Sequence, residues 1–202
     1  MGNVIVLTII ILTLVVISLL LVRPSLMTVQ GGKILAFIAF FIMPVIAMAL
    51  GTSLHLEHSK STRFCLSCHT MEAYGKSLSY DDPAFVPASH FQNKRIPIDQ
   101  ACFTCHTDYT MFGDLSAKLR GLNHLYVYYF KTVPEKLALY ERYKNRECLH
   151  CHADARSYET SSPHKEMKQQ LTSNQISCLT CHNKIHDVGQ VDKAKMWKGP
   201  NA

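Results

Sequence analysis

Four copies of one pentapeptide, Cys-x-x-Cys-His, carry the clearest chemistry in this chain. In this motif two thiols form thioethers with the vinyl groups of a haem, and the adjacent imidazole binds the iron. The four copies take up all 8 cysteines of the chain. The sequence therefore predicts four covalently attached c-type haems, held by Cys65, Cys68, His69, Cys102, Cys105, His106, Cys148, Cys151, His152, Cys178, Cys181 and His182.

Two other uses of paired cysteines are a disulfide framework and a pair of Cys₄ zinc sites. Neither requires a histidine directly after the second cysteine, and here all four pairs have one. Because histidine makes up only 11 of the 202 residues, four such placements by chance are improbable. Haem attachment is therefore the preferred interpretation.

Histidines outside the motif position are candidates for the second axial ligand. A low-spin haem iron has two axial ligands, and their identity tunes its potential. His106, His152 and His182 are predicted to be the proximal ligands of three haems. Their distal ligands would come from the set His55, His58, His90, His124, His150, His164 and His186. His150 lies inside the third motif and is interpreted as an incidental spacer residue.

Two uncharged apolar runs, residues 4–22 and 34–54, precede the motifs. At about 1.5 Å per residue, a helix of 19 residues spans about 28 Å, close to the hydrocarbon thickness of a bilayer. Pro44 lies in the second run, where a membrane helix tolerates it. Residues 1–54 are therefore predicted to form a transmembrane hairpin. The alternative is a cleaved signal peptide followed by one anchor, but the chain lacks its basic start and its small-residue cleavage site.

The location of the haems predicts the topology. Because c-type haem is attached outside the cytoplasm, we expect a bacterial inner-membrane protein with its haem domain in the periplasm. Two spans place the N-terminus on the same side. Arg23 and Lys33 then lie in the cytoplasmic loop, in agreement with the positive-inside rule.

Residues 55–190 are predicted to form one compact, mainly helical multihaem domain with little or no β-structure. Its apolar content is modest, so four flat apolar haems would supply much of the core. Leu115 to Tyr129 predicts a helix with an aromatic face, for haem packing or, as the less favoured alternative, a quinone pocket. A second helix is predicted to begin at Pro134-Glu135-Lys136 and to run through Leu139 and Tyr143.

The remainder, residues 191–202, is a basic polar tail, and from Val188 onward we expect a loose surface arm. The formal net charge of +6 offsets haem propionates and favours anionic lipid or an acidic partner. Nucleic acid is not expected as a partner.

The four motifs behind an N-terminal anchor, with Met71 after the first motif and His186 after the last, resemble the NapC/NirT/NrfH family of membrane-anchored tetrahaem quinol dehydrogenases. The resemblance covers residues from about 60 to 190. It implies that Met71 binds the first iron in place of His69, and a thioether ligand would raise the potential. The alternative is that His69 binds this iron and Met71 only packs.

The resemblance also implies distal ligands for the other haems. It assigns His186 to the third haem and His90 to the fourth. His164 is the candidate for the second haem, although a partner protein could supply that ligand instead.

Family members carry a lysine and an acid near the first haem, and the resemblance implies a quinol site there. Lys118 matches the lysine, and His124 takes the place of the acid. A histidine can accept a quinol proton near neutral pH. Alternatively, His124 is an iron ligand or makes a structural hydrogen bond. Asp108 and Asp114 are further candidate bases, and a quinol or proton role at the membrane interface is a less favoured interpretation of His55 and His58.

The predicted function is oxidation of membrane quinol and relay of electrons to a periplasmic reductase or other redox protein. One alternative is a non-catalytic wire subunit of a larger membrane complex, docked through the hairpin. A second is a quinone-reducing relay that runs in reverse, and a third is a reductase with an open iron.

Overall fold

The structure is a computed structural model that describes residues 2–134, 137, 139 and 141–198. The chain divides into two units, Met1–Ser59 and Lys60–Ala202. Across the described residues the regular structure is helical. The β-structure in this part of the chain is one isolated antiparallel bridge between Tyr80 and Met196, which does not form a sheet. The prediction of a mainly helical protein with two long apolar N-terminal helices is confirmed.

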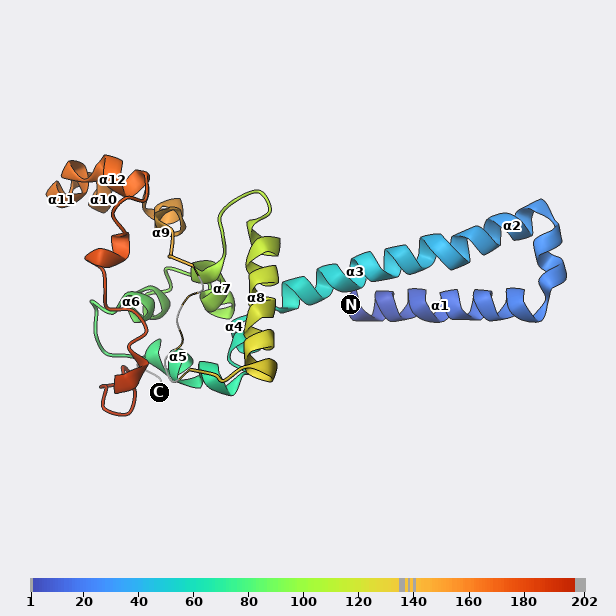
Figure 1. Ribbon diagram of the computed structural model, residues 1–202, viewed down its shortest axis with the longest axis horizontal. Coiled ribbons are helices and arrows are strands. Elements are labelled where there is room, and N and C mark those ends of the chain that lie inside the picture. Colours follow the sequence, from blue (N-terminus) through green and yellow to red (C-terminus); the bar gives the residue numbers. More distant parts are fainter. Residues whose placement is uncertain (1, 135–136, 138, 140, 199–202) are drawn as a thin grey trace. The chain divides into compact units, whose positions relative to one another are not determined.

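The first unit is built from two long helical segments that lie side by side (Figure 1). The first is α1 (Gly2–Val22), and the second combines α2 (Gln30–Phe37), a π-helical turn η2 (Ile38–Ile42) and α3 (Met43–His58). A short 3-10 turn, η1 (Pro24–Thr28), connects them. Both segments are long and apolar enough to cross a membrane.

The π-helical turn lies directly before Pro44. Proline has no backbone N–H and its ring clashes with the carbonyl four residues earlier, so the regular hydrogen-bond pattern cannot continue through it. A wider π turn absorbs this defect while the helix goes on. The second helix therefore remains continuous over residues 30–58 despite its proline.

The second unit consists mostly of short helices, several of which carry the cysteine motifs. They are α4 (Thr62–Cys65), α5 (Glu72–Ser77), α6 (Val86–Gln92), α7 (Ala101–His106), α8 (Gly113–Phe130), α9 (Asn145–His152), α10 (Arg156–Thr160), α11 (Ser162–Glu166) and α12 (Lys168–Thr172). Short 3-10 turns lie at η3 (His69–Met71), η4 (Ile98–Gln100), η5 (Cys178–Thr180) and η6 (Val188–Gln190).

The C-terminal tail is not the loose arm that was expected. Tyr80, Phe85 and Ala88 form a small buried cluster, and Val191, Ala194 and Met196 pack against it. The backbone joins in, because the Asp81 amide donates to the Lys195 carbonyl at 2.8 Å and the Trp197 amide to the Ser79 carbonyl at 2.7 Å. Three apolar residues spaced between the lysines anchor this segment to the domain.

Of the two helices predicted in the middle of the chain, one is observed. Helix α8 covers the predicted range 115–129. Its first residue, Gly113, lies so close to the preceding loop that an added Cβ would be 1.4 Å from the Asp108 carbonyl oxygen. For the second helix, residues 135 and 136 lie outside the described part of the chain, and residues 137, 139 and 141–144 are not helical.

Candidate functional site

The four motifs lie in or beside short helices. The first begins at Cys65, the last residue of α4, and its Cys68 is extended; the second lies in α7, the third in α9, and the fourth begins at η5. Residues three apart in a helix lie on the same face, so α7 and α9 each present both thiols of their motif to one side. In these two motifs the backbone already has the local geometry that a doubly attached cofactor requires.

The first and second motifs are in contact. The thiols of Cys65 and Cys102 lie beside each other, and their interaction lowers the pKa of Cys65 to about 7 and raises that of Cys102. Thr62 joins their helices, because its hydroxyl donates to the Ile98 carbonyl and accepts from the Ala101 amide, each at 2.8 Å. One threonine thus sets the beginning of α7 against α4.

The third and fourth motifs are joined in the same way. The thiols of Cys148 and Cys178 lie beside each other, and their interaction raises the pKa of Cys148 and lowers that of Cys178 to about 7. Asn145 is 2% exposed, and its side-chain amide donates to the carbonyls of Leu171 and Ile176 at 2.8 and 2.6 Å. Its side-chain oxygen accepts from the Cys178 amide at 2.9 Å. Asn145 therefore holds the fourth motif against the helix of the third.

Polar contacts join the second motif to the third. The Tyr109 amide donates to a Glu147 carboxylate oxygen at 3.0 Å, and the Tyr143 hydroxyl donates to the Cys105 carbonyl at 2.5 Å. Asp108, only 8% exposed, is ion-paired with Arg146. The four motifs therefore form a spatial series in the same order as in the sequence.

Three pairs of histidine rings face each other across this series. The ring centres are 6.2 Å apart for His106 and His186, 5.8 Å for His90 and His152, and 6.2 Å for His164 and His182. Two imidazoles bound to opposite sides of one metal, each at about 2 Å, have ring centres about 6 Å apart. The three pairs therefore fit a bis-histidine iron, with a motif histidine on one side.

The pairs differ from those that the resemblance implied. His186 faces the histidine of the second motif instead of the third, and His164 faces that of the fourth motif instead of the second. His90 pairs with His152 of the third motif. It also lines a cavity of about 340 Å³ together with Cys181 and His182, so it lies between the third and fourth motifs.

Desolvation keeps these rings in the form that can bind a metal. It is the main cause that lowers the pKa of His106 and His152, and it lowers that of His186 to about 4. The surfaces of the His106 and His152 rings are accessible, but the protein atoms around them still disfavour the charged form. His186 also has a left-handed backbone with φ 41°, which is unusual for histidine and is found at constrained sites.

The first motif has a different environment. His69 is exposed and belongs to none of the three ring pairs, and Met71 ends the same 3-10 turn, half-buried. The prediction that Met71 or His69 binds the first iron is compatible with this arrangement and is not decided by it.

Lys118 lies beside the first two motifs. Its ammonium is 4.4 Å from the centre of the Phe103 ring, and its charge contributes to the lowered pKa of Cys65. Lys60 approaches the same ring at 5.5 Å and forms a 2.8 Å ion pair with Asp114. This contact is the main cause that lowers the pKa of Asp114.

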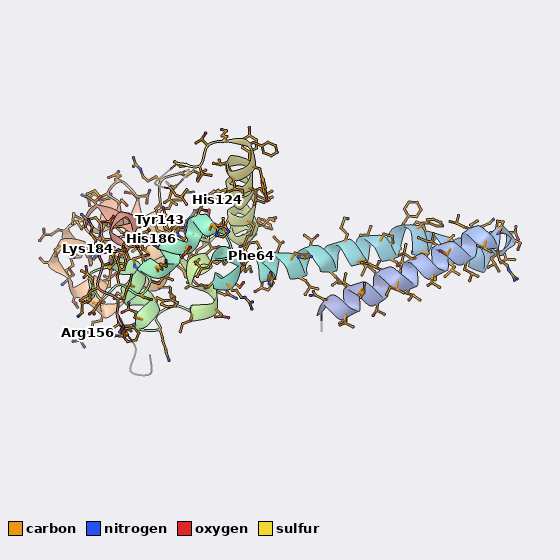
Figure 2. The ribbon with its side chains drawn as sticks, turned by 90° about the horizontal axis from the view of Figure 1, so that it is seen from below. Phe64, His124, Tyr143, Arg156, Lys184 and His186 are labelled. Atoms are coloured by element: carbon orange, nitrogen blue, oxygen red, sulfur yellow. The ribbon has the colours of Figure 1, made fainter. Side chains whose placement is uncertain are left out.

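His124 points elsewhere. Six residues along α8, its side chain is about 120° round the helix from Lys118. Figure 2 shows it near His186 and Tyr143, and its proximity contributes to the lowered pKa of His106. Desolvation lowers the pKa of His124 itself. The two residues predicted for one quinol site therefore lie in different places: Lys118 is beside Cys65 and Phe103, where the first two motifs meet, and His124 is toward His106 of the second motif.

Some residues carry contacts that sequence reasoning did not assign. His150, interpreted as a spacer, stacks on Tyr109 with ring centres 3.8 Å apart. Asp108, a candidate base, is buried in ion pairs with Arg146 and Arg120. Thr62 and Asn145 gave no sequence signal at all, because a lone threonine or asparagine has no distinctive spacing. His55 and His58 lie in the last turn of α3.

Comparisons with known proteins cover most of the chain. Residues 27–191 match the NapC/NirT cytochrome c family, N-terminal region. The cytochrome c-type protein NapC of Haemophilus influenzae is 22% identical over 152 residues, which are 67% of this chain and 72% of that protein. NapC of Escherichia coli K12 is 24% identical over 162 residues, covering 70% and 78% of the two chains.

The cytochrome c-type protein TorC of Escherichia coli K12 is 28% identical over 171 residues. The match covers 76% of this chain but 42% of TorC, so the chain spans about two fifths of that relative. No solved structure matches the chain.

Proposed function

The chain belongs to the NapC/NirT cytochrome c family, and we propose that it is a membrane-anchored tetrahaem cytochrome that oxidises membrane quinol and passes the electrons to a periplasmic redox partner. Membership in this family of c-type haem cytochromes implies electron transfer. Beyond family membership, we propose four haems, quinol as the donor and a periplasmic redox partner. We also propose an inner-membrane location with two spans and a periplasmic haem domain.

The observation that carries the proposal is the spatial series of the four motifs. Thr62 joins the helix of the first motif to that of the second, Asn145 joins the third motif to the fourth, and polar contacts join the middle pair. Bound haem supplies the one-electron redox chemistry. The chain's own residues fix the distance between neighbouring sites, which is what a relay of electrons requires.

Axial ligation follows from the ring pairs. His106 and His186 would hold the second iron, His152 and His90 the third, and His182 and His164 the fourth. Each pair has a motif histidine next to its cysteines and a second histidine from a distant segment. His69 or Met71 would complete the first site, which would differ from the others in its ligands and in its potential.

Quinol oxidation has to release protons as well as electrons. The first motif is the proposed entry point, because Lys118 lies beside its Cys65, and the Lys60–Asp114 pair lies beside Phe103 of the adjoining second motif. These groups can bind a quinol oxygen or accept a proton. The catalytic role of Lys118 and His124 stays a prediction. Asp108 is a weaker candidate than Asp114, since two arginines hold its carboxylate.

The test is anaerobic mixing of the oxidised full-length protein, in detergent or vesicles, with a menaquinol analogue while the haem absorption is followed. We expect rapid reduction, slowed at least about tenfold in Lys118→Ala, as removal of a positioned polar group predicts. Lys131→Ala, on the last turn of the same region, is the matched control and should reduce at the parent rate. Equal haem content of all variants must be verified first.

A second candidate is a wire subunit that receives its electrons from another protein. The position of His124, near His106 of the second motif instead of the first, favours it. In that case the oxidised protein would stay oxidised with quinol and would be reduced readily by dithionite. That outcome would replace the quinol proposal and leave the relay in place.

A further inference from the structure

Helix α8 carries an exposed apolar stripe on the side that faces away from its domain. Its members recur at spacings of three and four, the pattern of one helical face, and are 46% to 77% exposed. They are Phe112, Leu115, Leu119, Leu122, Tyr126, Tyr129 and Phe130. On the opposite side, Gly113 is buried and Ala117 half-buried in the first half of the helix, whereas Tyr128 near its end is 47% exposed. We call these seven residues the outer face of α8.

The composition of the outer face fits a membrane interface. Soluble surfaces rarely show so many contiguous large apolar side chains, and four of the seven here are aromatic. Tyrosine and phenylalanine are suited to this boundary, and tyrosine is enriched at the level of the lipid headgroups. Lys131 lies beside the face, with its ammonium 5.3 Å from the Tyr126 ring, where it could meet an anionic headgroup.

Chain connectivity limits how far Lys60, the ion-pair partner of α8, can lie from the end of the second candidate span. The second candidate span, Gln30–His58, has 29 residues. At about 1.5 Å per residue it is about 43 Å long, the thickness of a bilayer with its headgroups. Lys60 follows two residues later, within about 7 Å of the end of the span. Its ammonium forms the 2.8 Å ion pair with Asp114 in the first turn of α8.

We propose that α8 lies on the bilayer surface, with its outer face buried at the boundary between headgroups and acyl chains. An amphipathic helix binds in this way through its apolar side while its other side stays polar or attached to protein. The bilayer is the favoured occupant over a second copy of the chain, because Lys60 ties the helix to the end of a candidate span. The proposal does not depend on whether quinol is the electron donor.

The test is photolabelling of the full-length haem-loaded protein in vesicles that contain a lipid with a photoactivatable acyl chain. Trypsin cleaves after Arg120 and Lys131 and releases the haem-free peptide 121–131, which carries four members of the outer face. Peptide 157–165, between Arg156 and Lys165, is an equally haem-free control from the largely exposed α10–α11 region. We expect at least about tenfold more lipid adducts on 121–131 than on 157–165.

Two single variants identify the face. Leu122→Asp places a charge on the outer face and should reduce the adducts on 121–131 about threefold or more. Gly121→Asp, at a position about 130° round the helix from the middle of the outer face and with open space around it, should change them little. Equal labelling of the two peptides in the parent protein would overturn the proposal. Strong labelling that Leu122→Asp leaves unchanged would also overturn it, as would a cross-link of 121–131 to a second copy in place of lipid.

Discussion

The two units of this chain differ in their backbone hydrogen bonds and in the burial of their apolar side chains. In residues 2–59 the backbone hydrogen bonds are local to long helices, and large side chains such as Val22 and Met48 are 78% and 68% exposed. In residues 60–198 most helices are short, and the described part has only eight buried apolar residues. Contacts between residues far apart in the sequence, such as those of Thr62 and Asn145, hold these short helices together.

The difference shows what each unit needs from its surroundings. A helix in lipid needs no protein core, because every backbone group is paired within the helix and the side chains can face the acyl chains. The second unit has too few buried side chains to stabilise a domain of its length alone. We therefore expect its folded structure to depend on bound haem and on a few long-range hydrogen bonds, such as those of Thr62 and Asn145.

The largest effect should come from preventing haem attachment. We expect that Cys148→Ser/Cys151→Ser, which removes one attachment site, increases the rate of proteolysis within residues 60–198 at least about tenfold, because a ligand that binds only the folded state stabilises it. The helices of residues 2–59 should remain protected. Pulsed proteolysis with mass spectrometry measures both regions in one sample.

Unchanged proteolysis of the second unit, with one haem fewer confirmed by mass, would contradict this difference between the units. The control is Ser67→Ala, a substitution inside the first motif that leaves both of its cysteines in place.

Removal of a distal histidine should sharpen the assignment of haems within the second unit. His186→Ala should convert one haem from low spin to high spin, detected by electron paramagnetic resonance. His150→Ala, which removes a histidine from the stack on Tyr109, should leave all haems low spin.

A combined variant separates the two possible pairings. If His186 binds the second iron, adding Cys102→Ser/Cys105→Ser should abolish the high-spin signal of His186→Ala, because the affected haem is gone. A high-spin signal that persists, with the other three haems present, would return His186 to another haem.

The variant Asn145→Ala tests how much the long-range hydrogen bonds contribute to the stability of the second unit. Asn145→Ala removes three side-chain hydrogen bonds and leaves the Cys178 amide and two carbonyls without this partner. We expect a loss of about 2–4 kcal/mol in the free energy of unfolding of the haem-loaded domain, the range for a broken buried network. Denaturant titration measures it, and the exposed Asn123→Ala should differ from the parent by less than about 0.5 kcal/mol. If Asn145→Ala also lost less than about 0.5 kcal/mol, the haems alone would hold the motifs together.

The smallest effect concerns the Lys60–Asp114 ion pair. The hydrogen bond from Lys60 is the main cause that lowers the pKa of Asp114 below its usual value of 3.8. A carboxyl with a lowered folded-state pKa contributes stability above its unfolded pKa and loses it as the pH falls through the folded value. Lys60→Met should therefore lower the melting temperature slightly at pH 7, and the difference should disappear as the pH falls below 3.8 and through the folded-state pKa of Asp114.

Melting curves between pH 2 and 7 measure this difference, with the exposed Lys198→Met as the control. A difference that stays constant down to pH 2 would assign it to the lost contact between Lys60 and Phe103 instead of to the ion pair.

The sequence by itself determined the features that depend on adjacent residues. Two thiols and a histidine within five residues specify haem attachment whatever the fold, and an apolar run of sufficient length specifies a helix that can span a bilayer. The range of α8 followed from local periodicity in the same way. The family was recognisable because its markers, such as Met71 after the first motif, are also local.

Only the tertiary structure decided which distant residues meet. His186 faces His106 across 80 positions of sequence and His90 faces His152 across 62, so no spacing rule could have chosen these pairs over those that the resemblance implied. The tertiary structure also decided that the C-terminal tail packs against Tyr80 and that Lys118 and His124 lie apart. Each depends on how the chain folds back on itself, and that is set by the sum of many weak contacts instead of by any local pattern.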